Sequence, residues 1–354
     1  MDRPANWASE ADLRAVAFTG RLREYLPIVA SNTLLTIVTL GIYRFWAKAR
    51  TRRYLWSHTR VIDDTLEWSG TGKEMFVGFL LVALCLLPVA LFVAFGLPAL
   101  AARLRPEIVA VLAVLLYPLV LGFVAFARFR ALRYRLNRSW WHGVRGGSEH
   151  SGRDYAGRAI LLNLASYLSG LLLYPWAQTQ LWNRRWRSMS FGTLTFASEL
   201  RSKDTFGAWM VFWLCLVGAS IVLTLFTDPQ IIVYGPGAPW LVVPVLLYLL
   251  LGLAYLHYSA TFYSAALDGM RLGELEFGFE AEHGDWVAFY AATIGLAIIT
   301  LGLAMLIYDY RKWRFMTKHV RVYGELDLAA LRQSETRLQR DAEGFAESFD
   351  LGAF

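Results

Sequence analysis

The sequence predicts an all-α polytopic membrane protein with parallel internal repeats, in which spanning helices alternate with re-entrant or broken helices and short cytoplasmic β-hairpins. Composition, the apolar runs and an internal period of about 130 residues predict this class. Of the 354 residues, 56% are hydrophobic and only 18% are charged, and the mean hydropathy is +0.39. Soluble domains carry about 25% charged residues. The composition therefore excludes a disordered chain, a collagen-like chain and a two-domain soluble enzyme.

Seven apolar runs follow a polar N-terminal segment that has no signal-peptide pattern. Each run is about as long as the ~20-residue helix that crosses a bilayer. The runs cover residues 25–43, 75–99, 108–127, 159–177, 208–227, 240–258 and 286–308. The runs that begin at 75, 108, 208 and 240 contain no charged residue, whereas the other three are rich in Asn, Ser, Thr and Gly. The seven runs are therefore of two kinds.

The basic residues predict how the chain is threaded. If all seven runs cross, 23 Lys and Arg face one side and 12 the other; if the three polar runs return to the side they entered from, the split is 33 to 2. Short cytoplasmic loops carry an excess of Lys and Arg. We therefore expect four spanning helices, three re-entrant or broken segments and both termini in the cytoplasm. Seven ordinary, kinked crossings remain the alternative.

Internal similarity supports a repeat. A shift of 130 residues places Trp46-Ala47 on Trp176-Ala177, and a shift of 261 places Thr39-Leu40-Gly41 on Thr300-Leu301-Gly302. Two crossings in each unit give parallel copies, an arrangement known in transporters. The predicted organisation is a polar N-terminal segment over 1–24, membrane repeats over 25–130 and 131–260, a partial repeat over 261–328, and an amphipathic tail over 329–354.

Alternating apolar and polar residues beside glycine predict short strands. The pattern occurs at residues 64–68, 192–196, 273–277 and 324–328. An isolated pair of strands is marginal in water, so we expect these segments to pair with one another in a small cytoplasmic sheet. The tail over 329–354 has a helical apolar stripe, and its acidic end favours docking on the protein rather than lying on a membrane.

These residues carry a family resemblance. The run Asn32–Tyr43 (NTLLTIVTLGIY), followed by Trp46-Ala47 and Arg53-Tyr54, resembles the signature of the YjgN-type bacterial inner-membrane proteins, a family defined by a domain of unknown function. The copy at Thr300-Leu301-Gly302 resembles it as well. The resemblance implies a multi-pass protein of the bacterial inner membrane, and it implies no activity.

No catalytic, cofactor or metal site is predicted. Gly70-Thr71-Gly72-Lys73-Glu74 lacks the first glycine and the Ser or Thr of a phosphate-binding loop. Cys85 and Cys215 lie inside apolar runs, and the six histidines are scattered. The acidic residues between Glu274 and Asp285 are interpreted as a solvated face, with a cation or proton entry site as the alternative. We therefore expect a protein that is not an enzyme.

Two functions fit the sequence. The first is a transporter or channel with a polar path at the repeat interface, lined by Asn32, Thr36, Thr39, Gly41, Asn163, Ser166, Thr293 and Gly302. The alternative is a non-catalytic lipid-binding or membrane-organising protein, in which interfacial aromatic and basic side chains hold headgroups. Those candidates are Trp46, Arg50, Arg53, Tyr54, Arg130, Arg133, Tyr134, Trp176, Arg311 and Arg314. The expected partners are anionic lipids and, in a homo-oligomer, further copies of the chain, with no nucleic acid.

Overall fold

The computed structural model describes residues 15–150, 152–226, 239–324 and 331–333. Within them, the prediction of an all-α protein is wrong, because the helices carry a substantial β-sheet. Eight strands pair in the order β11-β10-β9-β8-β7-β6-β5-β4, every pairing is antiparallel, and β1, β2 and β3 form a second sheet. The strands are β1 Val16–Phe18, β2 Thr59–Val61, β3 Asp64–Thr65, β4 Glu67–Trp68, β5 Ser139–Trp141, β6 Val144–Gly147, β7 Ser190–Phe191, β8 Leu194–Ser198, β9 Met270–Leu272, β10 Leu275–Phe279 and β11 Val320–Tyr323.

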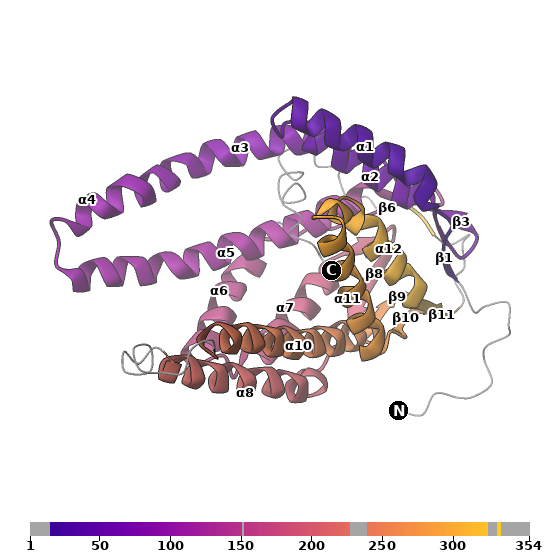
Figure 1. Cartoon of the computed structure of the whole chain (residues 1–354). Coiled ribbons are helices and arrows are strands. Elements are labelled where there is room, and N and C mark those ends of the chain that lie inside the picture. The colour runs from indigo at the N-terminus through magenta and orange to yellow at the C-terminus, as the bar shows by residue number, and fades with distance from the viewer. Residues whose placement is uncertain (1–14, 151, 227–238, 325–330, 334–354) are drawn as a thin grey trace.

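The helices form successive helical hairpins between the strands (Figure 1). Three hairpins are short: α1 with α2, α6 with α7, and α11 with α12. Two are long: α3 with α5, and α8 with α10, and both extend in the same direction from the sheet in Figure 1. The helices are α1 Leu22–Val38, α2 Arg44–Ser57, α3 Gly72–Leu91, α4 Leu97–Ala101, α5 Pro106–Arg138, α6 Arg153–Leu168, α7 Tyr174–Arg187, α8 Ser202–Phe226, α10 Pro239–Asp268, α11 His283–Ile299 and α12 Tyr308–His319, with a π-helix at Phe92–Gly96 and a 3-10 helix at Leu303–Ile307.

Each helical hairpin is followed by a strand of one of the two sheets. The second helices α2, α5, α7, α10 and α12 run directly into β2, β5, β7, β9 and β11. The predicted strand segments correspond to β3 with β4, to β8 and to β10, but these strands do not pair with one another, since other strands separate them. Most of the segment predicted at 324–328 lies outside the described residues. The sheet is therefore larger than predicted, because a strand also follows each of these helices.

The three short hairpins turn in the same way. Each turn has two successive residues with positive φ: Leu40 and Gly41, Gly170 and Leu171, and Leu301 and Gly302. A hydroxyl just before each turn accepts a hydrogen bond from a backbone N–H just after it. The donor–acceptor pairs are Tyr43 N with Thr39 Oγ1 at 2.9 Å, Leu173 N with Ser169 Oγ at 3.1 Å, and Ala304 N with Thr300 Oγ1 at 2.9 Å. These bonds satisfy backbone donors that a helix end otherwise leaves open.

Two described stretches are long and apolar enough to cross a membrane, Ser202–Thr224 in α8 and Val242–Asp268 in α10. The bent pair Gly72–Leu84 and Leu86–Leu100 would add a third. The predicted number of four spans is therefore not confirmed: the run 108–127 lies on α5 but is not among these candidates. The predicted repeat boundaries at 130/131 and 260/261 fall inside the continuous helices α5 and α10. The period of about 130 residues stays a prediction.

Most of the predicted tail lies outside the described residues, but residues 331–333 contact the sheet. Thr193 N donates to Arg332 O at 3.1 Å, and Arg145 N in β6 donates to Gln333 Oε1 at 3.0 Å. Leu331 packs against the main hydrophobic core. This short stretch therefore docks on the protein, as the sequence favours for the tail.

Candidate functional site

A chamber of about 410 Å³ lies where the second helices of the hairpins meet the strands. Its walls come from α2, α5, α7, α10 and α12 and from strands of both sheets. We call it the central chamber, and its apolar wall consists of Leu55, Trp56, Val61, Leu66, Leu132, Trp186, Phe191, Phe196, Leu267, Met270, Phe277, Trp313, Met316 and Val320, with Val16. Residues more than 250 positions apart in the sequence thus line one cavity.

Hydrogen bonds and ring stacking fix the aromatic part of the chamber wall. The rings of Trp56 and Trp313 stack with their centroids 4.4 Å apart. Trp313 Nε1 donates to Thr59 Oγ1 at 2.8 Å, and Trp56 Nε1 donates to Ser139 Oγ at 2.8 Å. Buried indole N–H groups need such partners. With both donors satisfied, these two indoles present apolar faces to the chamber.

The charged side chains of the chamber are mostly basic. Lys48, Arg52, Arg135 and Lys312 line it, and Asp309 is the one acid among its described lining residues. Arg52 is only 7% exposed, and its guanidinium carbon lies 5.5 Å from the Trp56 ring centroid and 5.2 Å from that of Trp68. Cations over aromatic faces are attracted by the ring quadrupole.

This lining suits a ligand that is part apolar and part anionic. A volume of about 410 Å³ falls in the range of small-molecule sites, roughly 300–1,000 Å³. A carboxylate or phosphate removed from water needs cationic or hydrogen-bonding partners, which the basic side chains supply. Burying a hydrocarbon portion against the aromatic wall contributes about 25 cal/mol per Å². Among the described residues, no group of three or more His, Cys, Asp or Glu could hold a metal ion.

The predicted polar-path residues lie in the short hairpins and line neither this chamber nor the second cavity described below. Asn32 is 6% exposed, donates from Nδ2 to Ala47 O at 3.2 Å and accepts from Arg50 Nη1 at 3.2 Å. At the corresponding position of the second short hairpin, Asn163 Oδ1 in α6 accepts from Gln178 Nε2 in α7 at 3.4 Å. Their polar groups thus join the two helices of a hairpin.

The other polar-path candidates bond locally or form turns. The hydroxyls of Thr36, Ser166 and Thr293 donate to the carbonyl four residues earlier, with distances of 2.6, 2.8 and 2.7 Å. The hydroxyl of Thr39 donates to Leu35 O at 2.7 Å. Gly41 and Gly302 occupy the left-handed turn positions. A polar path through these residues stays a prediction.

The predicted headgroup residues divide by burial. Tyr54, Arg133 and Tyr134 are enclosed in the protein, where Tyr54 OH donates to Arg21 O, Arg133 Nη1 to His150 O and Tyr134 OH to Glu74 Oε2. Half-buried members are Trp46, Arg130 and Arg311, and exposed members are Arg50, Arg53, Trp176 and Arg314. None of the ten lines a described cavity. A headgroup role stays a prediction for the exposed members.

The sequence reasoning missed the basic residues that do line the chamber. Lys48 and Arg52 belong to the basic stretch that follows the first apolar run, in which Arg50 and Arg53 are the predicted headgroup residues. Lys48 and Lys312 are two of only five lysines in an arginine-rich chain. This rarity is the feature of the sequence that could have drawn attention to them. Only the fold shows that these two side chains share a cavity.

The membrane-length helices and the polar, strand-bearing ends of the hairpins define this molecule as a membrane protein with a ligand-sized chamber beside its sheet. The chain belongs to the family described as bacterial protein of unknown function (DUF898), whose model matches residues 14–348. The predicted resemblance is thereby confirmed.

Curated relatives of this chain are named inner membrane protein YjgN. The chain is 28% identical over 138 residues to that of Salmonella typhimurium, which is 39% of this chain and 32% of the relative. It is 40% identical over 63 residues to that of Escherichia coli K12, which is 18% of this chain and 16% of the relative. The matched stretches thus span at most about a third of these relatives. No solved structure matches the chain.

Proposed function

We propose that this protein is a non-catalytic inner-membrane protein that binds an anionic amphiphile, such as a lipid or fatty acid, in the central chamber. The observation that carries the proposal is the combination of an aromatic and aliphatic wall with four basic side chains in one cavity. Either feature alone has an ordinary structural explanation. Together they match a ligand with a hydrocarbon portion and an acidic group.

Location supports this class of ligand. The relatives are named inner membrane proteins, and the long hairpins contain the membrane-length helices. We place the sheet and both termini on the cytoplasmic side, since the basic residues gather there under the positive-inside rule. In this arrangement the chamber lies where the second helices of the hairpins enter the cytoplasmic sheet, within reach of the inner leaflet.

Transport through a polar path has less support. Its eight candidate residues line neither cavity, and most of their side chains are used in local hydrogen bonds. Binding in the chamber requires none of them. Binding is therefore the function that the geometry favours.

The test is to purify the full chain in a mild detergent, extract the molecules that remain bound and identify them by mass spectrometry. The variant Lys48→Gln with Lys312→Gln removes two chamber cations. Electrostatic contacts to a partly buried anion are strong, so we expect the retained acidic amphiphile to fall about tenfold. The matched control is Lys73→Gln with Lys203→Gln, two exposed lysines at the starts of α3 and α8, outside both cavities.

A second variant tests the apolar wall. Met316→Trp replaces a linear side chain with a bulkier indole in the chamber and should reduce retention of the amphiphile while leaving all chamber charges in place. The proposal is wrong if the wild-type protein retains no acidic amphiphile, or if both chamber variants retain as much as the control variant.

A further inference from the structure

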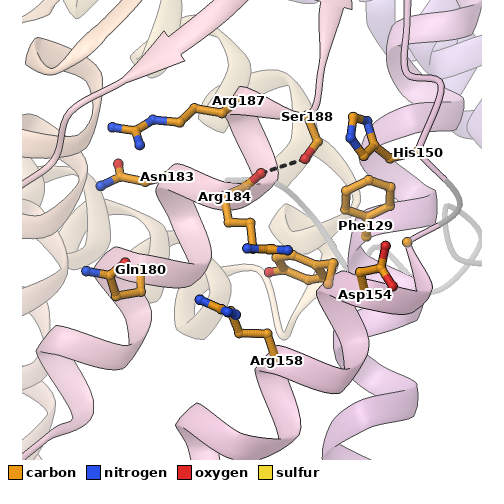
Figure 2. A pocket seen from close by; sticks show the side chains of 11 residues that line it. Phe129, His150, Asp154, Arg158, Gln180, Asn183, Arg184, Arg187 and Ser188 are labelled. Atoms are coloured by element: carbon orange, nitrogen blue, oxygen red, sulfur yellow. Dashed lines mark hydrogen bonds between the residues drawn. The ribbon is translucent and has the colours of Figure 1, made fainter.

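A second cavity lies between α5, α6 and α7, outside the central chamber. We call it the α6–α7 groove. It has a volume of about 520 Å³ and is lined by polar and basic residues rather than by an aromatic wall. Figure 2 shows its lining side chains, which are Phe129, His150, Gly152, Asp154, Tyr155, Arg158, Gln180, Asn183, Arg184, Arg187 and Ser188.

Two arginines from facing helices extend into this groove. Figure 2 shows Arg158 extending from α6 and Arg184 from α7. Both are exposed. Within the described part of the chain, neither guanidinium has a hydrogen bond, an ion pair or a ring contact. Arg187 also lines the groove, and its Nε donates to Ser198 O at 2.9 Å. The guanidinium of Arg187 points away from the other two in Figure 2, so Arg158 and Arg184 are the pair that faces the groove.

The start of α6 adds donors to the same groove. Gly152 is the residue before the helix, has φ of +83°, and no side chain caps the first turn. A Cβ on Gly152 would lie 2.7 Å from Phe129 Cδ1, so glycine lets α6 begin directly against α5. Open N–H groups and the helix dipole favour an anion at this end. Asp154 is the acid in the lining and lies on the side of His150 in Figure 2.

The groove also lies between a charged part and an uncharged part of the α6–α7 hairpin. Residues 159–183 contain no Asp, Glu, Lys or Arg, so Arg158 and Arg184 are the charges on either side of the uncharged hairpin tip. On that tip, Leu161 is 68% exposed and Leu168 is 77% exposed. Basic side chains directly beside an exposed apolar surface are typical of the headgroup region of a membrane.

We propose that the α6–α7 groove binds a phosphate group, held between Arg158 and Arg184 at the start of α6. Guanidinium groups bind phosphate oxygens through paired, charge-assisted hydrogen bonds. The position beside the apolar tip favours the phosphate of a lipid headgroup over that of a soluble compound. The groove is separate from the central chamber, so either site can fail without the other.

The test measures binding of three probes to the full chain in detergent: a short-chain phosphatidylglycerol, a diacylglycerol with the same chains but no phosphate, and inorganic phosphate. We expect Arg158→Gln with Arg184→Gln to weaken phosphatidylglycerol binding about tenfold or more and to leave diacylglycerol binding unchanged. Each measurement is made in the Lys48→Gln, Lys312→Gln background as well, which removes the contribution of chamber cations.

The matched control is Arg60→Gln with Arg201→Gln, which removes two exposed arginines outside both cavities. A further variant, Asp154→Asn, removes the negative charge from the groove and should strengthen phosphatidylglycerol binding about twofold or more. This gain cannot come from a misfolded protein, so it tests the site even if the double arginine variant fails to fold.

The probes also identify the source of the phosphate. Binding of phosphatidylglycerol that inorganic phosphate does not displace indicates a lipid headgroup. Binding of inorganic phosphate that Arg158→Gln with Arg184→Gln abolishes indicates a soluble phosphate compound at the same site. The proposal is overturned if the double variant, folded as judged by circular dichroism, binds every probe as the wild type does, or if Asp154→Asn leaves binding unchanged.

Discussion

The short and long helical hairpins differ in how polar side chains are used. In α1–α2 and α6–α7, buried Asn32 and half-buried Asn163 bridge the two helices, and hydroxyls bond to the turns. In the long hairpin α8–α10, Ser220 is exposed, and among the described residues its hydroxyl bonds to Leu216 O of its own helix alone. The polar residues of the short runs therefore stabilise a tight reversal of the chain, which also explains why these runs contain Gly, Ser and Thr.

The largest effect is expected where a long hairpin begins against a short one. A Cβ on Gly72, the first residue of α3, would lie 2.6 Å from Trp46 Cα and 2.8 Å from Trp46 N in α2. Because backbone cannot move aside cheaply, Gly72→Ala should destabilise the protein by about 1–3 kcal/mol. The measurement is the midpoint of thermal unfolding in detergent, followed by circular dichroism.

The control for this change is Gly218→Ala inside α8, where nothing lies within 4 Å of the added Cβ. Alanine favours a helix over glycine by about 0.5–1 kcal/mol, so this variant should be neutral or more stable. Equal midpoints for the two variants would contradict the tight junction between α2 and α3.

The next largest effect on stability is expected for a polar side chain of a short hairpin, compared with one of a long hairpin. Asn32→Leu removes the bond to Ala47 O and one of the three acceptors of Arg50 Nη1, which should cost about 1–2 kcal/mol. Ser220→Ala in the long hairpin should change stability by less than about 0.5 kcal/mol. Thermal midpoints in detergent measure both. If the two variants behave alike, polar groups do not set the short hairpins apart from the long ones.

This comparison shows which features the sequence predicted. The apolar runs correspond to helices, and their two kinds correspond to short and long hairpins, because side-chain polarity and turn-forming residues are local features. Positive φ at Leu40 and Leu301 was not foreseen, since leucine rarely adopts it. The matching triplets Thr39-Leu40-Gly41 and Thr300-Leu301-Gly302 nevertheless indicated equivalent positions.

The larger sheet and the chamber could not be predicted in this way. Strands such as β2, β5 and β7 have two or three residues and directly follow a helix, which is too short for an alternating pattern. Their pairing with distant segments stabilises them. The chamber likewise joins Lys48 in α2 and Lys312 in α12, and no local pattern shows that those helices converge.

The smallest effect on stability is expected for a side-chain contact between two strand turns. One turn follows the short hairpin α1–α2, and the other follows the long hairpin α3–α5. His142 Nε2, between β5 and β6, lies 2.8 Å from Asp63 Oδ1, between β2 and β3. This hydrogen bond from His142 lowers the pKa of Asp63 from its ordinary value of 3.8. A carboxyl whose pKa is lower in the folded state adds stability above pH 3.8, and that contribution is lost as the pH falls through the lowered pKa.

Asp63→Asn should therefore lower the thermal midpoint slightly at pH 7, and the difference from wild type should shrink as the pH falls below 3.8 and through the lowered pKa of Asp63. The effect is small because both side chains are partly exposed and water screens the contact. Glu67→Gln, at an exposed residue of β4 with no side-chain partner among the described residues, is the control. A difference that does not shrink once the carboxyl of Asp63 is protonated would contradict the contact.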